Sequence, residues 1–143
     1  MTDGVVTLHA TCVAVAGHGV LIFGPSGSGK SALALQLIAM GALLVSDDRT
    51  IVNREGGTLL ATSPSTIKGM IEARSVGILS VPHQERVPVM LAIDMACLEV
   101  MRLPERHSTT ILDIVVPCLH KVDAPYFPAA IHAYVVGMRK ETT

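Results

Sequence analysis

Residues 24–31 read Gly-Pro-Ser-Gly-Ser-Gly-Lys-Ser, which is the complete phosphate-binding pattern G-x-x-x-x-G-K-S. In this pattern the glycines let backbone N–H groups close around phosphate oxygens, the Lys reaches the β- and γ-phosphates, and the final Ser can ligate Mg²⁺. The competing interpretation is a glycine-rich turn that merely begins a helix. The pattern predicts these nucleotide-binding residues: Gly24, Pro25, Ser26, Gly27, Ser28, Gly29, Lys30 and Ser31.

The segments on both sides place this loop between a strand and a helix. Residues 19–23 are a short apolar run, and residues 31–40 are rich in the helix formers Ala and Leu. The N-terminus of that helix would add its free N–H groups and its dipole to the anion site. Gly41 is suited to end the helix, and residues 42–45 read as a buried strand. The order strand–helix–strand implies a right-handed parallel crossover.

Two adjacent carboxylates, Asp47 and Asp48, follow the strand predicted at 42–45. Ligands in such folds lie beyond the carboxyl ends of the strands, so the pair is expected to face the same crevice as the loop. Paired negative charge near phosphates is costly, and a metal ion together with Lys30 would offset it. Asp94, directly after an apolar run, is the alternative metal residue, although an aspartate there can also be a simple strand-end cap.

The rest of the chain predicts many strands and few helices. The fold class predicted is therefore α/β, with a P-loop-containing mixed β-sheet. The expected elements are a strand over 7–15, a hairpin over 49–61, a loop or helical turn over 64–70, strands at 78–81 and 87–93, an irregular charged segment over 94–108, short strands at 111–116 and 119–122, and a helix over 129–138.

The composition limits the classes of function. The 143 residues are enough for one domain with a core, and a net charge of −1 gives no electrostatic case for binding nucleic acid. The richest apolar stretch, 32–45, is too short to span a bilayer, and the first residues do not form a signal peptide. Cys12, Cys97 and Cys118 show no metal-binding spacing and are expected to be reduced in a cytoplasmic core. The apolar surplus is compatible with a buried subunit interface.

Four segments, in order, resemble the catalytic domain of HPr kinase/phosphorylase, the bacterial enzyme that acts on a serine of the phosphocarrier protein HPr. They are 7–10 with its His, 17–31 with the loop, 44–49 against the family's L-V-A-D-D, and 71–79 against E-I-R-G-L-G-I-I. Together they span more than half of the chain. The resemblance implies an HPr kinase/PEP carboxykinase-like fold and, over residues 1–143, a single P-loop kinase domain of the short form found in some bacteria.

The resemblance also assigns roles to individual residues. Asp47 matches the proton acceptor for the substrate serine, and Asp48 would assist metal or phosphate geometry. Ser31 and Glu72 match the Mg²⁺ ligands, and Lys30 holds the β- and γ-phosphates. Three further catalytic residues are implied: His9, Arg74 and Arg102. The implied cofactors are ATP and Mg²⁺, the implied partner is HPr, and the implied assembly is a cytoplasmic hexamer with neither nucleic acid nor membrane as a partner.

Some of these residues also have structural interpretations. His9 can be a hydrogen-bonded structural His, Glu72 and Arg74 an exposed strand pair, and Arg102 one member of a solvated charge cluster. The chain also departs from the family pattern: Ala73 and Ser75 replace the Ile and Gly of the signature, and 122–129 has no basic residue where the family has V-P-V-K/R-P-G-R-N.

We therefore expect kinase activity, whereas the missing basic segment argues against phosphorolysis, the reverse reaction in which phosphate attacks phosphoserine. The alternatives are a nucleotide-sensing regulatory module without catalysis, and a small-molecule kinase that uses Asp94 as its metal residue.

Overall fold

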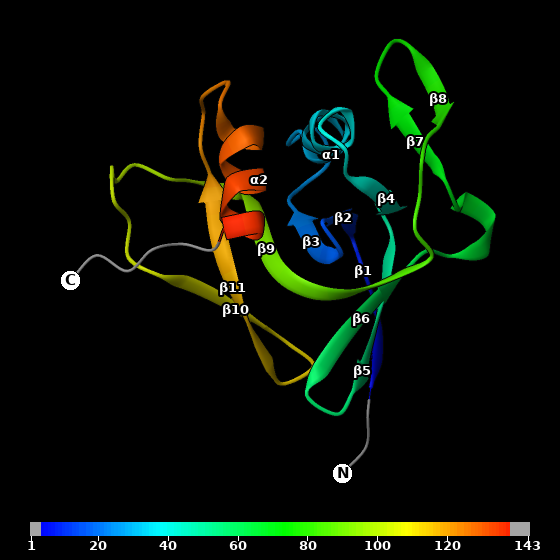
Figure 1. Ribbon diagram of the computed structural model, residues 1–143, viewed down its shortest axis with the longest axis horizontal. Helices are drawn as coiled ribbons and strands as arrows, with labels where there is room; N and C mark the ends of the chain where they lie inside the picture. The colour runs from blue at the N-terminus through cyan, green and yellow to red at the C-terminus, as the bar shows by residue number, and fades with distance from the viewer. Residues whose placement is uncertain (1–3, 138–143) are drawn as a thin grey trace.

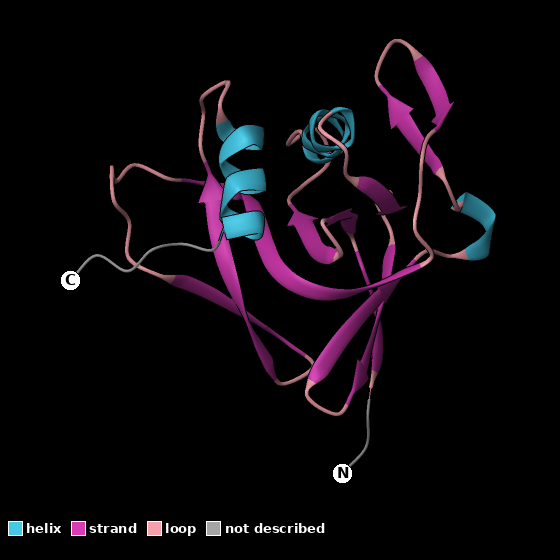
Figure 2. Ribbon diagram, viewed as in Figure 1, coloured by secondary structure: helices cyan, strands magenta, loops and turns pink. Residues whose placement is uncertain are grey.

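A mixed β-sheet with both described α-helices on one side makes up the fold (Figures 1 and 2). The computed structural model describes residues 4–137. Within that range nine strands form one sheet. Seven of them follow the order β1-β5-β6-β9-β3-β2-β4, and β10 and β11 join this sheet because β11 pairs with β9. Strands β7 and β8 form a separate hairpin. The elements are β1 (Val5–Leu8), β2 (Ala10–Val15), β3 (His18–Phe23), α1 (Lys30–Ala39), β4 (Leu43–Ser46), β5 (Thr50–Glu55), β6 (Thr58–Thr62), η1 (Ser65–Ile67), β7 (Met70–Ala73), β8 (Gly77–Ser80), β9 (Arg86–Leu98), β10 (His107–Ile111), β11 (Ile114–Lys121) and α2 (Phe127–Gly137).

The loop at 24–31 connects β3 to α1, as the sequence predicts. Strand β4 runs in the same direction as β3, because both pair antiparallel with β2, which lies between them. Gly41 follows α1 with φ +105° and donates its N–H to the carbonyl of Ile38 at 2.9 Å, which closes the C-terminus of the helix. The crossover therefore places the loop and the end of β4 at the same edge of the sheet. Neither helix within 4–137 has the length and apolarity that crossing a membrane requires.

The sheet separates two apolar cores. On the side of the helices, Ile22 and Ile93 pack with Leu37 of α1 and Ile131 of α2. On the other side, Leu21 and its neighbours pack with residues of β5, β6, β10 and β11. Successive residues of a strand point to opposite faces, so a strand that is buried on both faces has to be continuously apolar. Burial on both faces accounts for the apolar runs in β2, β3 and β9. The polar side chains of these strands lie toward the strand ends.

Several predicted boundaries differ in the structure. The strand expected over 7–15 is interrupted at His9, because β1 pairs with β5 while β2 pairs with β3 and β4. Residues 94–98, expected to be irregular, continue β9. The two short strands expected at 111–116 and 119–122 are replaced by the β10–β11 hairpin. Its turn is at Leu112 and Asp113, whose φ values of +49° and +65° match a two-residue hairpin turn. Met138, in the predicted last helix, lies outside the described residues.

The cysteines occupy two different environments. Cys12 and Cys118 are buried, as expected, whereas the expectation of a core position is wrong for Cys97, which is exposed. Burial raises the pKa of the Cys12 thiol, and it raises the pKa of Cys118 to about 11. Both buried thiols therefore stay protonated near neutral pH. The accessible thiol among the described residues is that of Cys97, because β9 continues past the core.

Replacing Gly19 with Ala is expected to lower the free energy of unfolding by about 1–3 kcal/mol. A Cβ at Gly19 would lie 2.8 Å from Val87 Cγ1 and 2.9 Å from the backbone oxygen of Pro88. Because β3 and β9 are paired there, the backbone can yield only by moving the strands apart. Denaturant unfolding measures the loss. Gly57→Ala is the control, since no heavy atom of the described chain lies within 4 Å of a Cβ at Gly57. Equal losses in the two variants would contradict the steric argument.

Candidate active site

A cleft of about 570 Å³ lies between the loop, the end of β4 and the β7–β8 hairpin. In Figure 1 this hairpin stands beside α1. The volume is in the range of small-molecule sites. The residues that line the cleft are Ser26, Gly27, Gly29, Lys30, Ser31, Ala32, Leu35, Asp47, Asp48, Glu72, Ala73, Arg74 and Val76. The structure therefore brings together three segments that are far apart in the sequence.

Lys30 is the buried cation of the cleft, with its side chain 5% exposed. Its Nζ donates hydrogen bonds to the backbone oxygens of Gly24 at 2.7 Å and Pro25 at 3.3 Å. It also lies 3.8 Å from Asp48 Oδ1. A buried ammonium group requires such partners, because its desolvation is otherwise costly. These contacts hold the positive charge between the loop and the carboxylate pair.

Asp47 is bonded on both of its carboxylate oxygens. Oδ1 accepts hydrogen bonds from Ser31 Oγ at 2.7 Å and from Thr11 Oγ1 at 3.1 Å. Oδ2 accepts the backbone N–H of Glu72 at 3.1 Å. Through these hydrogen bonds the Asp47 carboxylate links the end of β4 to α1, β2 and β7. It also contacts the Ser31 hydroxyl and the Glu72 backbone, and these are two of the three residues, with Asp48, predicted at the metal.

Asp48 has a different environment, although it is the next residue. Its backbone φ is +63°, a conformation that is uncommon outside glycine and that tends to occur at functional sites. Its Oδ1 lies 2.7 Å from His9 Nε2, and the two side chains are 60% and 53% exposed. Asp48 therefore presents an accessible carboxylate with a histidine partner, whereas Asp47 is surrounded by hydrogen-bond donors.

Thr11 is a site residue that sequence reasoning missed. It is fully buried in β2, donates to Asp47 Oδ1 and accepts the backbone N–H of Asp48 at 3.0 Å. It therefore fixes the positions of both aspartates. The sequence signal is a hydroxyl within the apolar run at 10–15, and that signal is weak because threonine is common in strands.

Two predicted residues are not part of this convergence. Arg102 is exposed in the loop between β9 and β10, which Figure 1 shows on the opposite side of α1 from the β7–β8 hairpin. Asp94, the alternative metal residue, is absent from the described residues that line the cleft and instead lies close to Cys97 and His120. Arg74, by contrast, lines the cleft next to Ser75, whose φ of +67° is a conformation that favours glycine.

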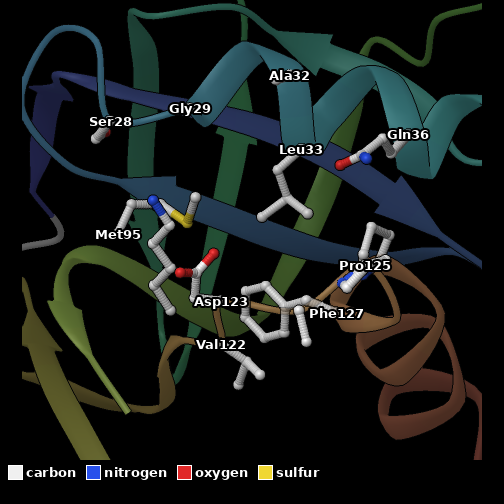
Figure 3. A pocket seen from close by; sticks show the side chains of 13 residues that line it. Ser28, Gly29, Ala32, Leu33, Gln36, Met95, Val122, Asp123, Pro125 and Phe127 are labelled. Atoms are coloured by element: carbon white, nitrogen blue, oxygen red, sulfur yellow. The ribbon is translucent and has the colours of Figure 1, made fainter.

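The loop has polar groups and space suited to an anionic ligand. Ser28 Oγ is buried and has no hydrogen-bond partner within the described part of the chain. Gly27 has φ +84°, and no described heavy atom lies within 4 Å of a Cβ built there. A second cavity of about 350 Å³ lies on the other side of the loop, and Ser28, Met95 and Phe127 are among the residues that line it (Figure 3). Phosphate oxygens suit such a loop, and the oxygens of Ser31, Asp47 and Glu72 suit Mg²⁺.

The sequence and the fold both have relatives. The HPr kinase/phosphorylase of Limosilactobacillus reuteri (strain DSM 20016) is 36% identical over 132 residues, which cover 83% of this chain and 40% of that protein. The enzyme of the same name from Clostridium botulinum (strain Eklund 17B) is 46% identical over 74 residues, covering 52% of this chain and 24% of that protein. The chain thus spans well under half the length of the curated relatives that it matches.

A solved structure supports the same relationship. The Hpr(Ser) kinase/phosphatase from Coxiella burnetii superposes with a TM-score of 0.77 at 30% sequence identity, covering 91% of this chain and 93% of that one. The predicted mixed sheet with few helices is therefore confirmed. The family model described as HPr Serine kinase C-terminal domain matches residues 4–117. The chain belongs to the HPr serine kinase C-terminal domain family.

Proposed function

We propose that this chain is an ATP- and Mg²⁺-dependent protein-serine kinase that phosphorylates a seryl residue of HPr in the cytoplasm. The observation that supports it most is the convergence of Lys30, Ser31, Asp47, Glu72 and Arg74 in one cleft. The matched relatives are named for two activities, a kinase and a phosphorylase. We propose only the kinase activity for this chain. A hexamer, implied by the family resemblance, is part of the same proposal and is testable by analytical ultracentrifugation.

The proposed phosphate and metal residues are those of the loop and of β7. The backbone N–H groups of the loop and the ammonium group of Lys30 would bind the phosphates, and Arg74 would stabilise charge that develops during transfer. Ser31 and Glu72 would hold Mg²⁺, with Asp47 between them. Bound Mg²⁺ would neutralise phosphate charge in this acidic cleft.

The contacts of the two aspartates support an exchange of the roles predicted from the sequence. A proton acceptor needs an accessible oxygen within reach of the substrate hydroxyl. Asp48 has one, and His9 lies beside it at 2.7 Å. Asp47 is engaged by Ser31, Thr11 and the backbone of Glu72. We therefore propose that Asp48 accepts the proton of the seryl hydroxyl and that Asp47 positions the metal ligands.

The segment after β11 supports a forward reaction only. The resemblance makes residues 122–129 the counterpart of the family's basic segment. Here they connect β11 to α2 and form the first residues of that helix, and most of them line the cavity in Figure 3. Asp123 lies in that lining together with Lys121, and residues 122–129 themselves contribute no basic side chain. The positive charge of Lys121 is opposed there by Asp123, and the basic residues of the family segment are missing, so we propose that phosphorolysis is weak or absent.

The hairpin beside the cleft supports a protein substrate. Val76 and Ile78 are 75% and 71% exposed, and Val76 also lines the cleft. Exposed apolar side chains at the edge of a site are suited to contact a protein surface rather than a small metabolite.

A transfer assay tests the proposed function. With Mg²⁺ and ATP labelled at the γ-phosphate, the chain is expected to label HPr on serine, and EDTA is expected to abolish labelling. Phosphopeptide mapping identifies the serine, and HPr with that serine replaced by Ala is the control. Phospho-HPr incubated with inorganic phosphate is expected to release no pyrophosphate. ATP binding without labelling of HPr would overturn the proposed substrate and would favour the regulatory module.

A further inference from the structure

A second cluster of chemically reactive side chains lies at the ends of β9 and β11, away from the cleft. One ligand atom from each of Asp94, Cys97 and His120 lies within 4.8 Å of the other two. The parallel register pairs Asp94 with His120, so their side chains are on the same face of the sheet. That face is the one opposite the helices, because Cys118, two residues earlier in β11, packs in the core of that side. None of the three belongs to the described lining of the cleft.

An irregularity in β9 creates this arrangement. The register pairs Asp94 with His120 and then Leu98 with Lys121, so residues 95–97 lie between two consecutive partners in β11. Asp94 Oδ1 accepts the backbone N–H of Ala96 at 2.9 Å, which stabilises the irregular segment. Bulges of this kind redirect side chains and are frequent next to functional sites. Here the bulge places the exposed Cys97 beside Asp94 and His120.

A neighbouring histidine–carboxylate pair fixes the ring of His120. The His107 ring stacks on it with a centroid separation of 3.8 Å and an interplanar angle of 7°. His107 Nε2 in turn lies 2.9 Å from Glu99 Oε1, and Glu99 Oε2 accepts the backbone N–H groups of Val100 and Met101, each at 3.1 Å. Both oxygens of Glu99 are thus occupied, which favours a supporting role for this pair over direct binding of an ion.

We propose that Asp94, Cys97 and His120 bind one Zn²⁺ ion. A thiolate and an imidazole favour a borderline transition metal over Mg²⁺, and tetrahedral zinc accepts a mixed sulfur, nitrogen and oxygen set. Three protein ligands leave the fourth position to water. On binding, the Cys97 thiol releases its proton to solvent as the zinc–sulfur bond forms.

The site has a structural connection to the loop. Met95 lies within the same bulge, and its side chain faces the other side of the sheet, where it lines the cavity of Figure 3 with Ser28 and Gly29. A Cβ at Gly24 would lie 2.9 Å from Met95 Cβ, which shows how closely the loop rests on this residue. Zinc would therefore hold in place the segment of β9 that supports the loop.

Metal titration of the untagged, metal-free chain tests the proposal. Excess Mg²⁺ is present to occupy any magnesium site in the cleft. Calorimetry with Zn²⁺ is expected to give one ion bound per chain, and Zn²⁺ is expected to raise the melting temperature, since a ligand of the native state stabilises it. Cys97→Ser and His120→Asn are each expected to weaken binding at least about tenfold. His18→Asn changes an exposed histidine at the start of β3, and this control variant is expected to bind like the wild type.

A spectroscopic measurement identifies the ligands. Co²⁺ bound to the wild type is expected to show thiolate-to-cobalt charge-transfer absorption, which Cys97→Ser removes. Circular dichroism of each variant without metal verifies that it is folded. The proposal is overturned if the wild type binds Zn²⁺ no more tightly than the double variant Cys97→Ser/His120→Asn. It is also overturned if His107→Gln and Glu99→Gln abolish binding while Cys97→Ser leaves it unchanged.

Discussion

Replacing Lys30 with Met is expected to lower the rate of phosphoryl transfer to HPr by about 10²–10³-fold, the usual effect of losing one charge-stabilising donor. Met has a similar length and apolar character, so it occupies the buried space that the lysine stem fills in the wild type. The variant lacks the ammonium group that contacts the backbone oxygens of Gly24 and Pro25 and lies near Asp48. Affinity for ATP is expected to fall as well, because the same charge would bind the phosphates.

Steady-state transfer to HPr and calorimetric titration with ATP measure these two effects. Lys68→Met is the matched control, because Lys68 is 41% exposed and pairs with Glu85 at 3.9 Å, outside the cleft. That variant is expected to keep the wild-type rate. Denaturant unfolding of both variants measures the effect on stability. The Gly24 carbonyl loses the lysine donor in Lys30→Met, at a cost of about 1–3 kcal/mol, whereas the Pro25 carbonyl still accepts the N–H of Ser28. A folded Lys30→Met variant with wild-type turnover would refute the role of the lysine.

Replacing Asp48 with Asn is expected to lower kcat by about 10²–10⁴-fold, the range for loss of a positioned general base. The amide oxygen of Asn can still accept a hydrogen bond from His9, and Asn tolerates the left-handed backbone at this position, so the geometry is preserved. The dependence of the rate on Mg²⁺ concentration is expected to stay unchanged. The missing function is then proton acceptance alone.

Asp47→Asn is expected to behave differently. An amide nitrogen in place of one oxygen would oppose either the hydroxyl donors of Ser31 and Thr11 or the backbone N–H of Glu72. The apparent affinity for Mg²⁺ is therefore expected to fall, and added Mg²⁺ is expected to restore part of the rate. Asp113→Asn is the control for both variants, because Asp113 has a similar φ of +65° in an exposed turn.

The pair of variants decides between the two assignments. If Asp47→Asn abolishes turnover at every Mg²⁺ concentration while Asp48→Asn is active, Asp47 is the proton acceptor, as the family resemblance implies. The family pattern cannot make this distinction from the residues themselves, because it contains two adjacent aspartates of identical chemistry.

What the sequence by itself determined lies in contiguous segments. Local backbone preferences specify the loop at 24–31, the strand before it, the helix after it and the glycine turn of the hairpin predicted over 49–61. Glycines supply left-handed φ angles, and Ala and Leu favour the helix. The position of Asp47 and Asp48 beside the loop also followed from the sequence, because a strand–helix–strand crossover returns the chain to the same edge of the sheet.

Only the tertiary structure decided which side chains meet across strands. Thr11 contacts Asp47 from 36 residues away, and Asp94, Cys97 and His120 converge because a bulge in β9 shifts its register against β11. Arg102 has the residue type of a catalytic group, yet its loop lies on the far side of α1 from the hairpin that carries Arg74. Strand register depends on how the two cores pack as a whole, and a one-residue change reverses the face on which a side chain lies. For that reason local patterns identified the phosphate loop, and the packing of the sheet determined its surroundings.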